Sequence, residues 1–259
     1  MTGSLLDAAL ADDPGRPFVT YYDDGTGERV ELSVTTLANW VAKTGNLLVD
    51  GLGVQPGEEL RLDLPRHWQL PVWALAAWTV GLVVDLDGTS RGCRVAVCGP
   101  EGIHAATAAA EDVVALSLRP LGAPFPSGAL PPGVLDYGRE VGGYGDRYSG
   151  PKARPEAAAV RSGETLLTLA DAQGHAAALA VVWGLGHRGR LHVYQPLDAL
   201  TELLAASLVP LSVGGSVVLT RAHPPEEGSF GDVLAARART ERTTAVASGG
   251  NHPGGLRRP

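Results

Sequence analysis

Strand-like and helix-like segments alternate through most of this 259-residue chain, and this alternation is the strongest constraint on its fold. Apolar residues at every second position, as at Leu60, Leu62 and Leu64, are typical of a half-buried strand. The apolar run at 70–86 predicts a helix that ends at Gly81 and a strand after it. Because strands that alternate with helices form parallel sheets covered by helices, we expect an α/β fold, layered α/β/α, with mixed, largely parallel sheets.

The same patterns place the other elements. The segment 23–27 lies between two strand-like runs and predicts a hairpin, and Ser33 predicts the cap of the next helix. Further strands are expected at 94–98, 112–118, 157–160, 190–194, 215–220 and 243–246, and further helices at 168–184, 198–209 and 231–239.

Segment 119–156 holds much of the chain's Pro and Gly and is expected to be a long surface excursion that joins two lobes. The lobes are expected at about 1–150 and 151–247, within one domain that covers 1–247. The polar, glycine-rich end, 248–259, is expected to be a disordered tail.

Charge and apolar content exclude several classes of protein. The net charge of −7 argues against general nucleic-acid binding, which requires a basic face. No run of 18 apolar residues is present, so no membrane span is expected, and the N-terminus does not resemble a signal peptide. The two cysteines, Cys93 and Cys98, flank one expected strand and are expected to pack in a reducing compartment. We therefore expect a cytoplasmic protein.

The stretch AVRSGETLLTLADA, at 159–172, has the ingredients of a phosphate-binding loop. It runs from a strand through a small turn into an alanine-rich helix that is expected to start near Thr168. Turn N–H groups and helix N-termini attract anions, and an ordinary strand-to-helix connection uses the same residues. Ser162, Gly163 and Thr165 are the candidate anion-binding residues.

Other candidate sites carry less weight. Gly99 to Gly102 form a turn between a strand and a helix, but Glu101 would repel a phosphate. His175, His187 and His192 match no zinc-binding spacing and are expected to be surface or capping residues, so no metal site is assigned. The nucleophile elbow G-x-S-x-G and the dinucleotide motif G-x-G-x-x-G are both absent, and no catalytic residue is assigned.

Several motifs, in order, resemble the large N-terminal domain of the AMP-forming adenylating enzymes, the superfamily of acyl-CoA synthetases, luciferases and peptide-synthetase adenylation domains. The matching segments are "ELSVTTL" at 31–37, "GVQPGE" at 53–58, "AAWTVGLVVDLD" at 76–87, "LLAASLVPLSVGGSVVLT" at 203–220 and "ERTTAVAS" at 241–248. The match covers roughly residues 14–247 and looks most like a short, degenerate actinobacterial subgroup that lacks the C-terminal half.

The resemblance implies an ATP site, with Mg²⁺, at the stretch singled out above. The family's loop has the form TSGTTGxPKG, and Arg161, Ser162 and Gly163 fall on its Thr-Ser-Gly. About six residues are then missing, including a glycine, the proline and the lysine. Lys152 lies before the strand and is discounted as a displaced remnant, and Asp198 stands where the family often has a histidine. The family's later adenine, metal and ribose segments and its C-terminal domain with the catalytic lysine have no match.

The resemblance leaves three functions open. The first is a degenerate, non-catalytic relative of acyl-CoA synthetases that binds a nucleotide, an acyl ligand or a partner protein through a vestigial phosphate loop. The second is an ATP-dependent carboxylate-activating ligase, completed by a partner chain or shortened by an error in the gene. The third is a protein-interaction module that binds no nucleotide. A protein partner or a homo-oligomer is expected because the missing half would leave apolar surface uncovered.

Overall fold

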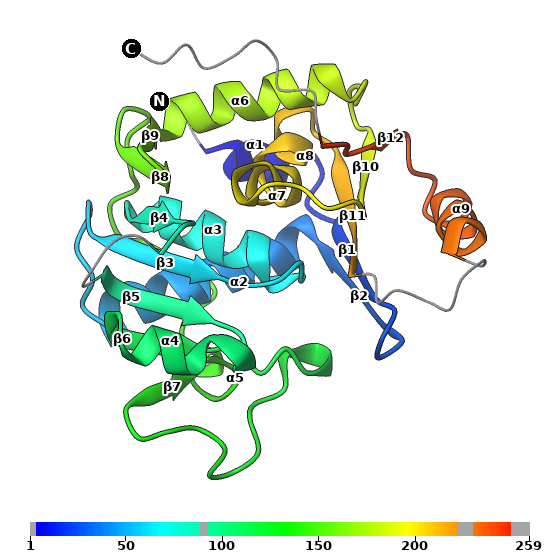
Figure 1. The fold of residues 1–259 in the computed structure, drawn as a ribbon. Coiled ribbons are helices and arrows are strands. Elements are labelled where there is room, and N and C mark those ends of the chain that lie inside the picture. The colour runs from blue at the N-terminus through cyan, green and yellow to red at the C-terminus, as the bar shows by residue number, and fades with distance from the viewer. Residues whose placement is uncertain (1–3, 89–92, 222–229, 250–259) are drawn as a thin grey trace. The chain divides into compact units, whose positions relative to one another are not determined.

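The computed structural model describes residues 4–88, 93–221 and 230–249 (Figure 1). The chain forms two compact units: Met1–Thr35 together with Gln173–Pro259, and Thr36–Ala172. The division differs from the expected lobes at about 1–150 and 151–247, because the first 35 residues belong with the last part of the chain. Each unit contains a mixed, mostly parallel sheet, and the α/β class is confirmed.

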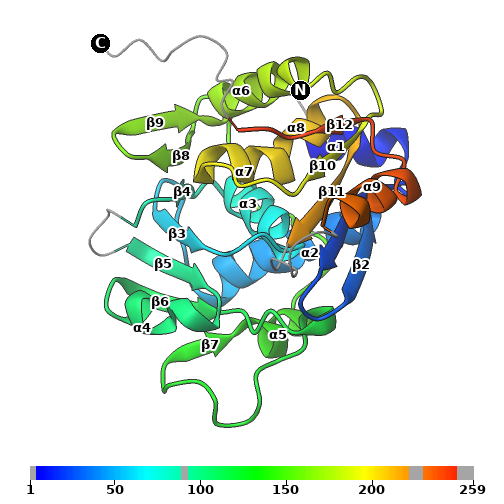
Figure 2. The same ribbon diagram turned by 45° about the vertical axis from the view of Figure 1, so that its right-hand side comes forward.

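The unit formed by the two ends of the chain is built on a five-stranded sheet. Its strand order is β12 (Ala245–Val246), β10 (Arg190–Val193), β11 (Ser216–Arg221), β1 (Pro17–Asp23) and β2 (Glu28–Ser33). The expected hairpin is confirmed, since β1 and β2 are antiparallel, whereas the other neighbours are parallel. The helices of this unit are α1 (Leu5–Asp12), most of α6 (Leu169–Val182), α7 (Ala199–Ala206), α8 (Leu208–Ser212) and α9 (Phe230–Thr240). In both ribbon views α7 and α9 lie on opposite sides of this sheet (Figures 1 and 2).

The other unit is built on a seven-stranded sheet. Its order is β7 (Val134–Asp136), β6 (Ala110–Ala115), β5 (Cys93–Cys98), β3 (Glu59–Asp63), β4 (Val83–Asp85), β8 (Ala158–Ser162) and β9 (Thr165–Thr168). Among the described strands of this sheet, only β8 and β9 form an antiparallel pair, and the other neighbours are parallel. The helices of this unit are α2 (Val34–Asn46, followed by a π turn at Leu47–Gly51), α3 (Gln69–Val80), α4 (Ile103–Thr107) and α5 (Tyr137–Glu140), and 3-10 turns lie at Pro100–Gly102, Pro120–Gly122 and Val141–Gly143.

Helix α3 forms the centre of this unit's core. Nearly all of its residues are buried, including Trp73 and Trp78, as expected for a helix that is apolar on every side. It ends at Gly81, whose φ of +87° lies in the left-handed region that favours glycine. The expected helix end at Gly81 and the strand after it are confirmed.

The segment 119–156 is more than the expected surface excursion. It contributes the edge strand β7 and helix α5 to the seven-stranded unit. Tyr137 is 1% exposed, and its hydroxyl lies 2.7 Å from Thr44 Oγ1 in the core. A three-residue strand is too short to produce a periodic pattern, so the Pro and Gly content dominated the prediction.

Two smaller expectations need correction, and one lies outside the described residues. His192 is buried on β10, with its Nε2 atom 3.0 Å from Thr220 Oγ1, so the expectation of a surface or capping histidine was wrong. The helix expected at 198–209 is divided at Ser207 into α7 and α8. Most of the expected tail, from residue 250 on, lies outside the described residues.

Cys93 and Cys98 are buried and form no disulfide. Within the described ranges, no helix is both long and apolar enough to cross a membrane. The described His, Cys, Asp and Glu side chains form no group of three or more that could hold a metal ion.

Candidate functional site

The stretch singled out as a phosphate-loop candidate forms a tight β-hairpin. Strands β8 and β9 are antiparallel, and Ser162 pairs with Thr165. Gly163 and Glu164 form the two-residue turn between them. Gly163 has a φ of +57°, which is the conformation that such turns require and that glycine adopts without strain. The three candidate residues are therefore brought together at the tip of a hairpin.

This geometry corrects the expected strand–turn–helix connection. Strand β9 lies between the turn and helix α6, so the turn is not at the helix N-terminus. The N-terminus of α6 is instead capped by its own side chains. The Asp171 carboxylate accepts hydrogen bonds from the Thr168 N–H (3.1 Å) and hydroxyl (2.7 Å), and Thr168 Oγ1 accepts one from the Asp171 N–H (3.1 Å). This reciprocal capping box occupies two N–H groups at the start of the helix, and the two between them, of Leu169 and Ala170, donate to backbone carbonyls.

A carboxylate of the chain itself lies at the hairpin turn. The Gly163 N–H donates a hydrogen bond to Asp87 Oδ2. Asp87 reaches this position because β4 and β8 are parallel neighbours, and the Leu86 N–H continues their ladder by donating to the Arg161 carbonyl at 3.2 Å. The Asp87 N–H in turn donates to Asp85 Oδ1 at 3.1 Å, which bends the chain toward the turn.

The cation nearest to this turn in the sequence already has a partner. Arg161, on β8, donates from Nε and Nη2 to Glu59 Oε1 at 3.0 and 2.8 Å, and both side chains are about a quarter to a third exposed. Such a pair neutralises the guanidinium charge locally. Two carboxylates are therefore found at the turn: that of Glu164, a turn residue, and that of Asp87, which is bound to Gly163. The nearby guanidinium of Arg161 is already neutralised by Glu59.

Lys152 lies six residues before the start of β8, the end of the strand opposite the turn. It lines a separate cavity of about 520 Å³ together with Arg154, Glu156 and apolar residues of segment 56–57 and of the end of α3. The five residues of β8 span roughly 16 Å at the usual rise of a strand. Lys152 and the hairpin turn thus lie on opposite sides of β8 along the chain.

Asp198, which stands where the family often has a histidine, caps helix α7. Its Oδ1 accepts from the Thr201 N–H at 2.9 Å, and its Oδ2 accepts from the Thr201 hydroxyl at 2.6 Å. The carboxylate satisfies a helix N–H that would otherwise lack a partner. A structural role therefore accounts for the aspartate at this position.

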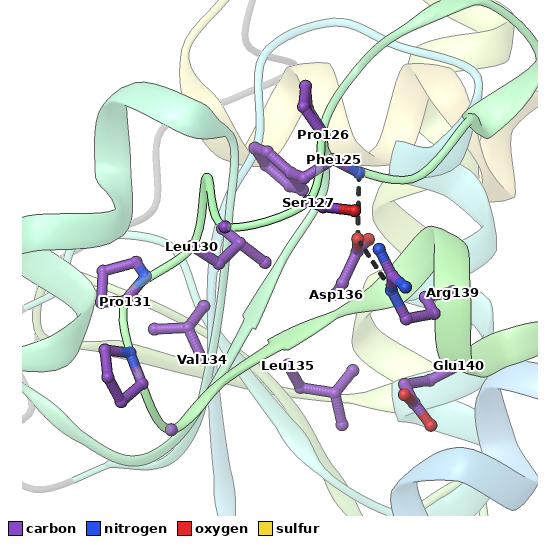
Figure 3. A pocket seen from close by; sticks show the side chains of 13 residues that line it. Phe125, Pro126, Ser127, Leu130, Pro131, Val134, Leu135, Asp136, Arg139 and Glu140 are labelled. Carbon is purple, nitrogen blue, oxygen red and sulfur yellow. Dashed lines mark hydrogen bonds and ion pairs between the residues drawn. The ribbon is translucent and has the colours of Figure 1, made fainter.

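A cavity of about 420 Å³ lies inside the loop 125–136, and the sequence did not indicate it (Figure 3). Phe125 and Asp136 close the loop, because the Phe125 N–H donates to Asp136 Oδ2 at 2.9 Å. Asp136 Oδ1 accepts from the Gly138 N–H at 3.1 Å, and the Arg139 guanidinium lies 3.8 Å from the carboxylate. Leu130, Pro131 and Val134 line the opposite side (Figure 3). The volume suits a small ligand, but many of the lining residues are exposed. The Pro and Gly content that predicted a loop gave no signal of a hollow within it.

Comparisons with known proteins give a relative in sequence and relatives in fold. The chain is 36% identical over 253 residues to a "TIGR03089 family protein" of Mycobacterium tuberculosis, and the match covers 95% of this chain and 97% of that protein. It is similar in structure to an acyl-CoA synthetase of Brucella canis, with a TM-score of 0.74 and 17% identity. That match covers 95% of this chain, which spans about half (47%) of the length of the synthetase. No family model matches the chain.

Proposed function

The chain belongs to the TIGR03089 family, and from this premise we propose that it is a non-catalytic relative of acyl-CoA synthetases. In this proposal the protein binds an acyl compound, a nucleotide or a partner protein and does not activate a carboxylate with ATP. The likeness in fold to the Brucella canis acyl-CoA synthetase supports the relationship. The hairpin turn at Gly163, closed by Asp87, supports the loss of activity.

Adenylation places strict demands on the site that performs it. The enzyme must hold a triphosphate and stabilise the charge that develops around the phosphorus atom in the transition state, with backbone N–H groups, cations and Mg²⁺. A two-residue turn offers few N–H groups, and Asp87 accepts one of them. Arg161 is paired with Glu59, and no lysine lies in the hairpin. These residues disfavour a triphosphate at this position.

Pyrophosphate exchange with a panel of carboxylic acids tests the proposal directly. We expect no exchange above background from the purified protein with ATP and Mg²⁺. Exchange that the double substitution Ser162→Ala and Gly163→Ala abolishes would contradict the proposal, because it would assign catalysis to the hairpin. Calorimetric titration with ATP and with an acyl-adenylate then distinguishes a nucleotide-binding protein from an interaction module.

A ligase completed by a partner chain is the second candidate. It is favoured by the extent of the structural match, because 95% of this chain follows the synthetase fold. Exchange that appears only when a co-purified partner is added back would support this candidate. Exchange under those conditions in the Ser162→Ala, Gly163→Ala variant would locate the chemistry in the partner.

A further inference from the structure

We infer that Asp87 acts as a built-in anionic ligand of the β8–β9 turn and is the residue that excludes external phosphate from it. This inference deepens the proposed non-catalytic function and rests on it. It assigns a specificity-determining role to a residue outside the stretch that the sequence singled out.

The contact follows from the way the sheet positions the two residues. In a two-residue hairpin, the residues that flank the turn pair with each other, as Ser162 and Thr165 do here. The N–H of the first turn residue, Gly163, remains available, and it donates to Asp87 Oδ2. Residues 85–87 run beside 160–163 because β4 and β8 are parallel, with Val84 opposite Val160 and Asp85 opposite Arg161. The placement of Asp87 is thus fixed by a strand ladder.

The chemistry of the contact matches that of an anion site. Backbone N–H groups in a turn with a left-handed residue bind carboxylates and phosphates alike. Hydrogen bonds to a charged acceptor are the stronger class, and an acceptor attached to the chain competes at a high effective concentration. A phosphate would also meet the charge of Asp87 itself and that of Glu164, the second turn residue. Asp87 therefore opposes phosphate both by occupying the donor and by repulsion.

Matched substitutions separate these effects. Asp87→Ala removes the acceptor and one negative charge. Glu164→Gln removes one negative charge from the turn and leaves the Gly163–Asp87 hydrogen bond in place; neither Glu164 nor Asp87 is buried. Asp87→Asn keeps an acceptor without the charge. All three changes lie at exposed positions, and circular dichroism and thermal unfolding confirm that each variant folds.

Two NMR measurements with inorganic phosphate test the inference. In the unmodified protein, we expect the Gly163 amide proton to exchange about tenfold or more slowly than in Asp87→Ala and to keep its chemical shift when phosphate is added. In Asp87→Ala, we expect phosphate to shift the Gly163 resonance and to bind about tenfold or more tightly than in Glu164→Gln. The phosphate affinity of Asp87→Asn is expected to lie between the affinities of Asp87→Ala and Glu164→Gln.

Three results would overturn the inference. The first is a Gly163 amide that exchanges equally fast in the unmodified protein and in Asp87→Ala. The second is a failure of phosphate to bind Asp87→Ala, which would leave the proposed non-catalytic function intact. The third is equal phosphate affinity in Asp87→Ala and Glu164→Gln. It would mean that only the loss of one negative charge, and not the release of the Gly163 N–H, increases phosphate binding. Pyrophosphate exchange by the unmodified protein, in contrast, would contradict the proposed function while the amide measurements still report on Asp87.

Discussion

Glu241, just after helix α9, and Arg190, at the start of β10, form an ion pair at 2.5 Å in which the two side chains are only 6% and 14% exposed. The same carboxylate accepts hydrogen bonds from Tyr22 on β1, at 2.5 Å, and from Arg29 on β2, at 3.0 Å. Glu241 thus links three strands of the five-stranded sheet: β10, β1 and β2. Arg237 of α9 adds a second link, because its guanidinium pairs with Asp24 at 2.6 Å.

Replacing Glu241 is expected to destabilise the protein strongly. Glu241→Gln keeps the size of the side chain but removes the carboxylate nearest to the largely buried Arg190, which then has only the more distant Glu31, at 3.7 Å, as an opposite charge. Loss of one partner of a buried ion pair typically costs about 3 kcal/mol. Urea unfolding followed by circular dichroism measures the change in the free energy of unfolding. Glu156→Gln is the matched control, because this exposed carboxylate makes no hydrogen bond or ion pair with the described residues, and its effect should stay within about 0.5 kcal/mol.

The contribution of Glu241 depends on pH in a predictable direction. Burial alone would raise the pKa of Glu241, but the hydrogen bonds from Tyr22, Arg29 and Arg190 outweigh it and lower the pKa below its ordinary value. Because the folded state has the lower pKa, the stabilisation is complete above the unfolded value of about 4.3 and is lost as the pH falls below it. The stability difference between the unmodified protein and Glu241→Gln should therefore shrink between about pH 5 and pH 3. A difference that grew on acidification would contradict this assignment.

Tyr137 tests whether segment 119–156 belongs to the core. Tyr137→Ala should cost about 3–5 kcal/mol, the range for loss of a large buried aromatic side chain. Tyr137→Phe should cost about 1 kcal/mol, because only the hydrogen bond with Thr44 is lost. Tyr148→Phe, which removes a hydroxyl whose hydrogen bond to the Pro151 carbonyl is long and exposed, should have almost no effect. If Tyr137→Ala changed the free energy of unfolding only negligibly, segment 119–156 would be a surface excursion and not part of the core.

Elements that are determined by neighbouring residues could be predicted from the sequence. Elements that form because strands pair with other strands could not. Gly81 ends α3 because only a left-handed residue suits that helix end, and glycine signals it in the sequence. Residues 165–168, in contrast, are too few to show a period, and they form β9 because β8 lies beside them. The pairing of Tyr21 with Leu219 joins residues from opposite ends of the chain, which no local pattern can reveal.

The same distinction explains the candidate site. Ser162, Gly163 and Thr165 could be chosen from their types and order, and the structure brings them together. Asp87 could not be chosen, because it lies 76 residues earlier and meets Gly163 only through the parallel ladder between β4 and β8. For the same reason, a short glycine-containing loop cannot be identified as an anion-binding loop from its sequence. The fold determines whether its N–H groups are free or are bound by a side chain from elsewhere in the chain.

Substitutions at Asp198 test whether this aspartate, found where the resembled family often has a histidine, serves only to cap helix α7. Asp198→Ala should destabilise the protein by about 1 kcal/mol, the usual cost of losing a helix cap, and Asp198→Asn should cost less. Asp198→His restores the residue type that the family often has, but it should also weaken the cap and give no pyrophosphate exchange. Asp232→Ala, in the first turn of α9, is the control, because its carboxylate makes no hydrogen bond with the described residues. Exchange in Asp198→His would show that one substitution restores activity, against the proposed function.

The buried thiols give a test that needs no ligand. Burial, with a smaller contribution from Asp63, raises the pKa of Cys98 to about 11, and burial also raises the pKa of Cys93. The thiolate is the reactive form, so at pH 8 only about 0.1% of Cys98 would be reactive even if reagent could reach it. Dithionitrobenzoate should therefore react with neither cysteine in the folded protein and with both after unfolding in guanidinium.

Ser127→Cys supplies the positive control, because this exposed position should react rapidly with one equivalent of reagent. Oxidation should not join Cys93 to Cys98, since five residues of one strand hold their Cα atoms roughly 16 Å apart, and a disulfide requires less than about 7 Å. Mass spectrometry of the oxidised, folded protein should accordingly show two free thiols. Rapid labelling of either native cysteine, or an internal disulfide, would mean that β5 is not the buried strand described above.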